Sequence, residues 1–549
     1  MSRRTEEIPQ NDHDPTGTAT GEPDGDRPNG LTKPAAPTTD GFAKPAIATT
    51  DGLAEPAATT DALAKPATAT MTDDPAKPAD GPGAITEPDP GRPRSWEAVR
   101  HLLVRLHFYA GVLVAPFLLV AALTGLAYTL TPQLDQLLYG DQLRVERVGD
   151  GPRPLAEQIA AARAAYPEGT VASVVTPQGP EETTRVVLAV PELGEKQRTV
   201  FVDPYTAEVR GELTTWFGST PLTTWLDDLH RNLNLGETGR LYSEVAASWL
   251  GVTVLGGLVL WLGRSRGQRA KSARGALLPD RKARGVRRTR SWHAATGVWL
   301  AVALLFLSAT GLTWSNYAGE RFGRLLDAAN GNAPALDTAL PGAEAPVEDH
   351  SDHAGHGGGE ATADADPADF DAALTAARNA GLGGTVVVTP AADAASAWTV
   401  AQNDNVWPVH YDRVAVDVAG GEITSRTYWA DHPALSKLSK LGVQGHMGVL
   451  FGVVNQIVLA LVALGLTAVI VWGYRMWWQR RPTRADRRAP VGRAPERGAW
   501  RRLPLPVLIL GIPAVAALGW ALPVLGVTLA GFLVVDVVAG AVRRQRRTA

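Results

Sequence analysis

Long apolar runs with few charged side chains recur along this 549-residue chain. A run of about 20 apolar residues is long enough to cross the hydrocarbon core of a bilayer as a helix. The runs that meet this length lie at 104–130, 243–262, 292–314 and 447–474. Two shorter runs follow within 503–541, interrupted by Pro513 and Pro523, and predict a terminal membrane hairpin. The sequence therefore predicts a polytopic α-helical membrane protein with about six spans.

The charged loops predict how these spans are oriented. Loop 263–291 is crowded with Lys and Arg and has one acidic residue, Asp280, and loop 475–502 is similarly basic. Basic loops stay on the cytoplasmic side, so 131–242 and 315–446 are expected outside the cytoplasm and both chain ends inside it. Because topology accounts for this charge and no recognition motif accompanies it, nucleic-acid binding is not expected.

The N-terminal residues 1–95 are rich in Ala, Pro, Thr and Asp and contain a degenerate repeat, "TTDGFAKPA", "TTDGLAEPA" and "TTDALAKPA". Such a segment has too little apolar surface to offset its ordering entropy, so we expect a disordered cytoplasmic tail. This segment lacks the central apolar stretch that a signal peptide contains. The chain has no cysteine, which excludes disulfides, thiolate metal sites and covalently attached haem.

The first apolar run has a copy later in the chain. "LHFYAG" and "TGLAY" in the first run correspond to "WHAATG" and "TGLTWS" in the third. At one constant offset, the second copy repeats four residues of the first, and the matched pairs are His107 and His293, Gly111 and Gly297, Thr124 and Thr310, and Gly125 and Gly311. This indicates an internal duplication.

The two outward segments also repeat each other. Each has a helix-like stretch, then β-type runs, then a hairpin, "VFVDPYTAEVRGEL" in the first and "VAVDVAGGEITSRT" in the second. Each segment therefore predicts a small α+β domain. Just before the following span, "DLHRNLNLG" carries His230 and Gly236, and "GHMGVLFG" carries His446 and Gly452 at the same spacing.

Duplication normally produces pseudo-symmetry, which would bring His107 to face His293 and His230 to face His446. Two imidazoles facing each other in an apolar bundle suit bis-axial haem ligation, and the nearby glycines would let a macrocycle, or a neighbouring helix, approach closely. A single interfacial histidine is usually a headgroup anchor instead. We assign that role to His101, which has no copy, and predict haem ligation for the four repeated histidines.

The motifs "LHFYAG", "DLHRNLNLG", "WHAATG" and "GHMGVLFG", in this order, resemble the PepSY-associated transmembrane proteins, over roughly 96–545. The resemblance implies a bacterial cytoplasmic (inner) membrane protein with two PepSY-like extracytoplasmic domains and a role in iron uptake. Some members are similar to siderophore-iron reductases that carry two b-type haems. The resemblance thus implies His107, His230, His293 and His446 as the ligands of two b-type haems.

The insertion "VEDHSDHAGHGGGE" places three closely spaced histidines in the second outward segment. His350, His353 and His356, with the carboxylates beside them, could bind a divalent metal weakly. The flanking Gly and Ala residues also fit a solvated linker. Both interpretations remain open at this point.

No H-E-x-x-H peptidase motif, P-loop or dinucleotide fingerprint occurs. We therefore expect electrons to come from a membrane quinol or a donor protein, and a ferric siderophore or other ferric chelate to be reduced outside the cytoplasm. The catalytic residues are unknown, and Glu244 could relay protons. Two alternatives remain: a transporter of metal or siderophore, and a non-enzymatic PepSY-domain sensor or protease regulator.

Overall fold

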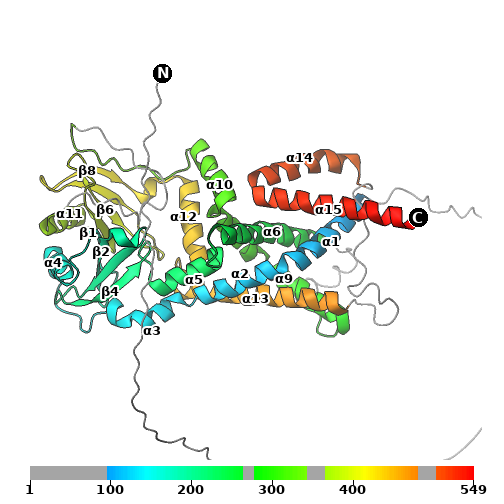
Figure 1. Cartoon of the computed structure of the whole chain (residues 1–549), viewed down its shortest axis with the longest axis horizontal. Helices are drawn as coiled ribbons and strands as arrows, with labels where there is room; N and C mark the ends of the chain where they lie inside the picture. The colour runs from blue at the N-terminus through cyan, green and yellow to red at the C-terminus, as the bar shows by residue number, and fades with distance from the viewer. Residues whose placement is uncertain (1–94, 264–276, 343–364, 480–502, 549) are drawn as a thin grey trace, which may run out of the picture. The chain divides into compact units, whose positions relative to one another are not determined.

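The structure is a computed structural model and describes residues 95–263, 277–342, 365–479 and 503–548 (Figure 1). In these residues four helices are long and apolar enough to cross a membrane: α6 (Gly236–Leu262), α9 (Gly285–Thr313), α13 (Val453–Gln479) and most of α15 (Pro523–Thr548). The bent pair α1 (Ser95–Leu113) and α2 (Ala115–Tyr128) adds a fifth if it is one span. The shorter apolar helix α14 (Leu505–Ala521) corresponds to the sixth expected run. The chain is a multi-pass membrane protein.

The first run, expected as one continuous span over 104–130, is broken. Helices α1 and α2 meet at an angle of 57° on either side of Val114. Pro116 lies in the first turn of α2 and has no N–H to donate to the carbonyl of Val112, four residues earlier. The hydroxyl of Tyr474 on α13 donates to this carbonyl instead, at 3.0 Å. The Val112 carbonyl at the break therefore still accepts a hydrogen bond inside the bundle.

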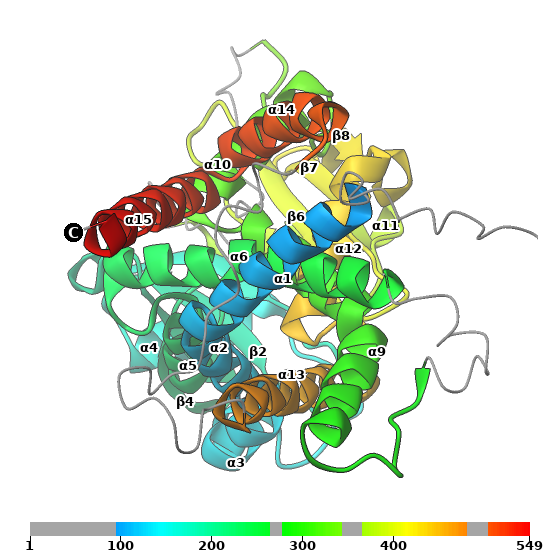
Figure 2. The ribbon, with the colours of Figure 1, turned by 90° about the vertical axis from the view of Figure 1, so that its right-hand side faces the viewer.

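Four helices form a closed ring of contacts, in which α2 packs on α6, α6 on α9, α9 on α13 and α13 back on α2 (Figure 2). The side chains between them form an apolar core that includes Leu118, Trp249, Leu304 and Val462. Outside the ring, α15 contacts α6, where the Trp249 indole donates to the Thr528 hydroxyl at 2.9 Å. Helix α15 is also tied to α1 by an ion pair between Arg105 and Asp536.

Helices α14 and α15 form the hairpin that the last two apolar runs predict. They contact each other at Gly519 and Gly526, and a Cβ added at Gly526 would come within 2.7 Å of the Gly519 carbonyl oxygen. Glycine at this crossing lets the two backbones approach closely, as in other membrane helix pairs.

The strands within 131–242 and 315–446 form one continuous sheet rather than two separate ones. Its eight strands follow the order β4-β3-β2-β1-β5-β6-β7-β8, with every neighbouring pair antiparallel. The strands are β1 (Thr170–Val175), β2 (Thr184–Ala189), β3 (Gln197–Val202), β4 (Val209–Thr215), β5 (Val386–Thr389), β6 (Trp398–Gln402), β7 (Arg413–Asp417) and β8 (Glu422–Thr427). The halves join where Val174 of β1 pairs with Val388 of β5. Without this pairing β1 and β5 would each be an edge strand with unpaired backbone groups.

One helix from each half packs on this sheet. Helix α4 (Leu155–Ala165) contacts β2, β3 and β4, whereas α11 (Pro367–Asn379) contacts the strands of the second half, and the two helices contact each other. Their apolar faces bury Ile159 and Phe370 completely. The carboxylate of Asp371 on α11 accepts the N–H groups of Leu155 and Ala156 at the start of α4. The predicted α+β halves therefore share one core.

The remaining elements connect the sheet with the spans. They are α3 (Thr131–Leu143), α5 (Pro221–Asn232), α10 (Asn316–Ala328), α12 (Ala434–Met447) and the short 3-10 helices Pro191–Leu193 and Trp429–Asp431. Helix α5 follows β4 and leads into α6, and α12 follows β8 and leads into α13. These two connecting helices carry His230 and His446.

Candidate functional site: two histidine pairs

The four repeated histidines form two facing pairs. His107 of α1 lies beside His293 of α9, with ring centres 6.2 Å apart and ring planes at 79°. His230 of α5 lies beside His446 of α12, with ring centres 6.4 Å apart and ring planes at 57°. The structure thus brings together the partners that the repeat pattern pairs. We call His107 and His293 the bundle pair, and His230 and His446 the cavity pair.

In the bundle pair each ring is held by a backbone carbonyl. The Nδ1 atom of His107 lies 3.0 Å from the carbonyl oxygen of Thr253, and that of His293 lies 2.9 Å from the carbonyl oxygen of Val469. A carbonyl can only accept a hydrogen bond, so Nδ1 must carry the proton. The neutral ring then keeps its lone pair on Nε2, the usual arrangement of a metal-ligating histidine.

In the cavity pair threonine hydroxyls replace the carbonyls. Nδ1 of His230 lies 2.9 Å from Oγ1 of Thr124, and Nδ1 of His446 lies 2.7 Å from Oγ1 of Thr310. Each hydroxyl donates its proton to a carbonyl of its own helix, that of Val120 or of Phe306. The hydroxyl therefore accepts from Nδ1, and Nε2 again keeps its lone pair.

A glycine lies beside each imidazole, and at Gly125 and Gly257 a side chain would crowd the ring. An added Cβ would approach the Cε1 atom of the histidine to 3.1 Å at Gly125 and Gly257, 3.4 Å at Gly311 and 3.8 Å at Gly473. Gly257 and Gly473 lie four residues after Thr253 and Val469, whose carbonyls hold the rings. The sequence alone did not single out Gly257, Gly473, Thr253 or Val469. Their signal was present, because Gly257 follows His230 at the same distance as Gly473 follows His446.

The other repeated glycines serve different purposes. A Cβ at Gly111 or Gly297, one turn after His107 and His293, would meet no atom within 4 Å. These two positions therefore border open space and are not helix contacts. Gly236 begins α6 and Gly452 directly precedes α13, and their φ of +58° and +55° lies in a backbone region that favours glycine.

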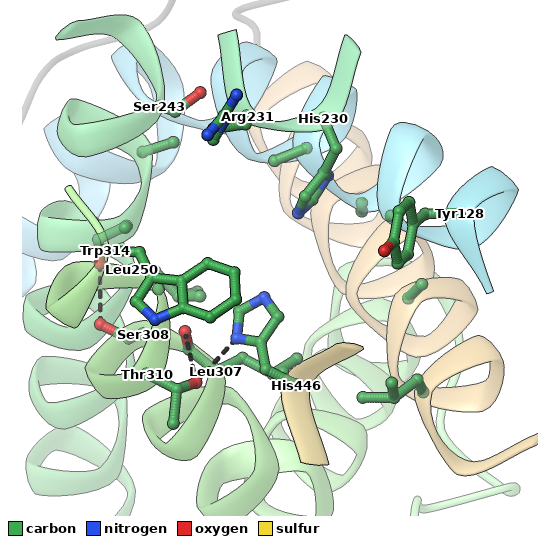
Figure 3. Close-up of a pocket in the computed structure, with 18 of the residues that line it drawn as sticks. Tyr128, His230, Arg231, Ser243, Leu250, Leu307, Ser308, Thr310, Trp314 and His446 are labelled. Carbon is green, nitrogen blue, oxygen red and sulfur yellow. Dashed lines mark hydrogen bonds between the residues drawn. The ribbon is translucent and has the colours of Figure 1, made fainter. Parts of the chain in front are cut away.

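The cavity pair opens into a large cavity within the helix ring (Figure 3). Its empty volume, including the part open to solvent, is about 1500 Å³, and most of its lining is apolar, with Leu118, Leu250, Leu304 and Val462 among the residues. Figure 3 shows His230 and His446 projecting into it from different helices, and the Trp314 indole also lines it. A largely apolar wall with a few polar groups converging on it is typical of a small-molecule site.

Four Asp, Glu and Arg side chains line the cavity: Asp227, Arg231, Arg240 and Glu244. Glu244 is almost fully buried, and its two carboxylate oxygens accept the N–H groups of Tyr317 and Ala318 at the start of α10. This contact caps a helix N-terminus, where negative charge is favourable. The structure thus gives the carboxylate of Glu244, considered above for proton relay, a capping role.

Burial keeps the cavity pair neutral. His230 and His446 lie on α5 and α12, outside the candidate membrane spans. Burial, followed by the neighbouring His230 ring, lowers the pKa of His446 to about 4, and burial also lowers the pKa of His230. A neutral imidazole is the form that binds a metal.

The two pairs lie at different levels of the ring. Helix α9 carries both His293 of the bundle pair and Thr310, which holds His446 of the cavity pair. At about 1.5 Å per residue, these two α9 positions are about 25 Å apart along the helix axis. This is close to the thickness of the hydrocarbon core.

The other predicted site residues are not part of either pair. His350, His353 and His356 lie outside the described residues. His101 is exposed on α1. Within the described part of the chain, no group of three or more His, Cys, Asp or Glu residues could hold a metal ion.

The chain was compared with protein families and with curated proteins. None of the curated proteins compared with the chain matches it. A family model described as "PepSY-associated TM region" matches residues 104–480, which include both histidine pairs. The chain therefore belongs to the family of PepSY-associated transmembrane proteins.

Proposed function

We propose that this protein is an integral membrane di-haem b electron-transfer protein that reduces a ferric siderophore or another ferric chelate outside the cytoplasm during iron uptake. The observation that carries the proposal is the presence of two facing histidine pairs in which all four Nδ1 atoms are engaged. A bound b-type haem supplies one-electron transfer between its ferric and ferrous states. The chain would hold one haem at each pair.

The spacing of the rings supports this assignment. A metal–imidazole bond is about 2 Å long and the ring centre lies about 1 Å beyond the nitrogen, so two axial ligands have ring centres about 6 Å apart. The observed separations are 6.2 Å and 6.4 Å. Each pair therefore has the ring separation that two axial ligands of one iron would have.

The donor set also favours a macrocycle over a bare metal ion. Each pair offers only two nitrogen donors, and no further His, Cys, Asp or Glu completes a metal-binding group in the described residues. A porphyrin brings its own equatorial nitrogens and requires only the two axial ones. The apolar lining of the cavity and the open space beside Gly111 and Gly297 suit its flat faces.

The direction of transfer rests on topology and on the family resemblance. We propose a bacterial cytoplasmic membrane with both chain ends in the cytoplasm, as the basic loops predict. The bundle pair then lies toward the cytoplasm and would receive electrons from quinol or a donor protein. The cavity pair lies on α5 and α12, which follow the outward strands β4 and β8, and would pass electrons to the chelate.

Absorption spectroscopy of the solubilised full-length protein from haem-replete cells tests this proposal. We expect a Soret band that shifts on reduction, with b-type α and β bands. His107→Ala or His293→Ala should remove about half of the absorbance, and His230→Ala or His446→Ala should remove the other half. His101→Ala, an exposed histidine on the same helix as His107, is the matched control. A colourless wild-type preparation would overturn the proposal.

The cavity itself favours a second candidate, transport of a metal or siderophore, because it is large and partly open to solvent. Uptake of radiolabelled ferric chelate into proteoliposomes distinguishes the two functions. Transport predicts uptake without any electron donor. Electron transfer predicts ferrous iron outside the vesicles only when a donor is supplied inside.

A further inference from the structure

Arg240 and Ser243 lie on one face of α6, one helical turn apart, and both line the cavity. The Ser243 hydroxyl oxygen is buried and has no hydrogen-bond partner among the described residues. Leaving a buried hydroxyl unpaired is unfavourable, so such a group in a cavity wall suggests that a ligand completes it.

Arg231 of α5, next to His230 in sequence, lines the same cavity. Its guanidinium lies 4.9 Å from the centre of the Trp216 ring and pairs with Asp227 and Asp228. Its buried Nε atom faces the Asp227 carboxylate at 3.5 Å and makes no hydrogen bond with the described residues. Figure 3 shows Arg231 and Ser243 toward the same side of the cavity, which His230 also lines.

The charges that line the cavity differ in how firmly they are paired. The carboxylate of Glu244 is used by two backbone N–H groups, and that of Asp227 faces Arg231 at 3.5 Å. Arg240 has a much weaker partner, the exposed Glu237 at 3.9 Å, whose other oxygen accepts from Asn316 at 2.6 Å. The Arg240 guanidinium is therefore the cavity charge best able to bind an incoming anion.

We propose that Arg240, Ser243 and Arg231 form a carboxylate-binding site at the rim of the cavity, and that its ligand is the pair of propionate groups of the tetrapyrrole held by His230 and His446. This inference rests on the proposed function and adds to it the orientation of the macrocycle. Arginine binds carboxylates through two parallel hydrogen bonds, and a serine hydroxyl can donate a third. The carboxylates would then face the start of α6, where Arg240 and Ser243 lie, and the apolar ring edge would face Leu304 of α9.

Titration of haem-depleted protein with ferric protoporphyrin IX and with its dimethyl ester tests the site. The ester has the same ring and iron but no carboxylate charge. The full chain carries His107→Ala and His293→Ala, so that only the cavity pair supplies two ligands. We expect the free acid to bind about tenfold or more tighter than the ester, as expected for hydrogen bonds to a charged group.

Arg240→Gln should weaken binding of the free acid by about tenfold and leave ester binding unchanged. Ser243→Ala should act in the same direction, and Arg240→Lys should keep most of the preference because the positive charge stays. Arg324→Gln is the matched control, since Arg324 of α10 pairs with Glu320 and does not line the cavity. Unchanged ester binding also reports that each variant is folded.

The outcomes separate this inference from the proposed function. If wild-type and variant chains bind the acid and the ester equally well, the carboxylate site is wrong and the haem proposal stands. If neither porphyrin binds the cavity pair, both proposals fail. If Arg240→Gln weakens acid and ester binding alike, Arg240 supports the cavity wall and the carboxylate site is likewise wrong.

Discussion

Gly257 of α6 lies directly against His107 of α1, and a Cβ at position 257 would come within 3.1 Å of the Cε1 atom of the imidazole. A Cβ added at the preceding residue, Gly256, would meet no atom within 4 Å. The two glycines are neighbours in one helix, yet only one of them makes room for a candidate ligand. This contrast supplies a matched pair of variants.

Gly257→Ala should displace the His107 ring, because 3.1 Å is too short for relaxed contact and the ring is also held by the Thr253 carbonyl. Gly256→Ala should be neutral or stabilising, by up to about 1 kcal/mol, since alanine favours a helix over glycine. Thermal unfolding in detergent measures the difference. Equal unfolding temperatures for the two variants would show that the ring tolerates the methyl group.

Thr310→Val should leave Nδ1–H of His446 without its acceptor, at a cost of about 1–3 kcal/mol for an unpaired buried donor. Valine has nearly the same shape as threonine, so packing changes little. Thr310→Ser should restore the hydrogen bond. Thr467→Val is the control, because the Thr467 hydroxyl donates to the Ala463 carbonyl of its own helix and not to a histidine in the described residues. The readouts are unfolding temperature and affinity for haem, and equal losses for positions 310 and 467 would count against the role of Thr310.

Acid should destabilise the haem-free protein through His446. Burial and the His230 ring lower the pKa of His446 from 6.5 to about 4 in the folded state. Between these values the unfolded chain binds a proton that the folded chain does not, so stability falls as the pH drops from 6.5 to 4. His446→Gln should flatten this part of the stability curve. A variant with an unchanged pH dependence would place the titrating group elsewhere.

Tyr474→Phe should destabilise the bundle by about 1 kcal/mol, because the Val112 carbonyl would lose the tyrosine hydroxyl that donates to it at the break between α1 and α2. The loss should depend on Pro116. In a Pro116→Ala background residue 116 has an N–H that can serve the same carbonyl, so Tyr474→Phe should cost less. A double-mutant cycle on unfolding free energies measures this coupling. Additive effects would mean that the tyrosine does not compensate for the proline.

The membrane class, the positions of the apolar runs and the histidine partners were all predictable from sequence. Hydrophobic length determines whether a helix can span a bilayer, and constant offsets between repeated residues indicate which positions are equivalent. The pairing of His107 with His293 followed from that equivalence, and the structure brings these two rings together. The histidine-rich insertion at 350–356 lies outside the described residues, and its metal binding stays a prediction.

Only the tertiary structure decided how the halves combine and what holds the rings. The β1–β5 pairing that merges two predicted domains into one sheet depends on strand edges, which no local pattern distinguishes from other edges. The acceptors at Thr253 and Val469 are backbone carbonyls, which every residue has, so their role comes entirely from which helix packs beside which. The same holds for the cavity, because its wall is built by six helices from distant parts of the chain. Periodicity and repeats can be read directly from the order of the residues. Strand edges, backbone carbonyls and cavity walls acquire their roles only through packing between distant parts of the chain.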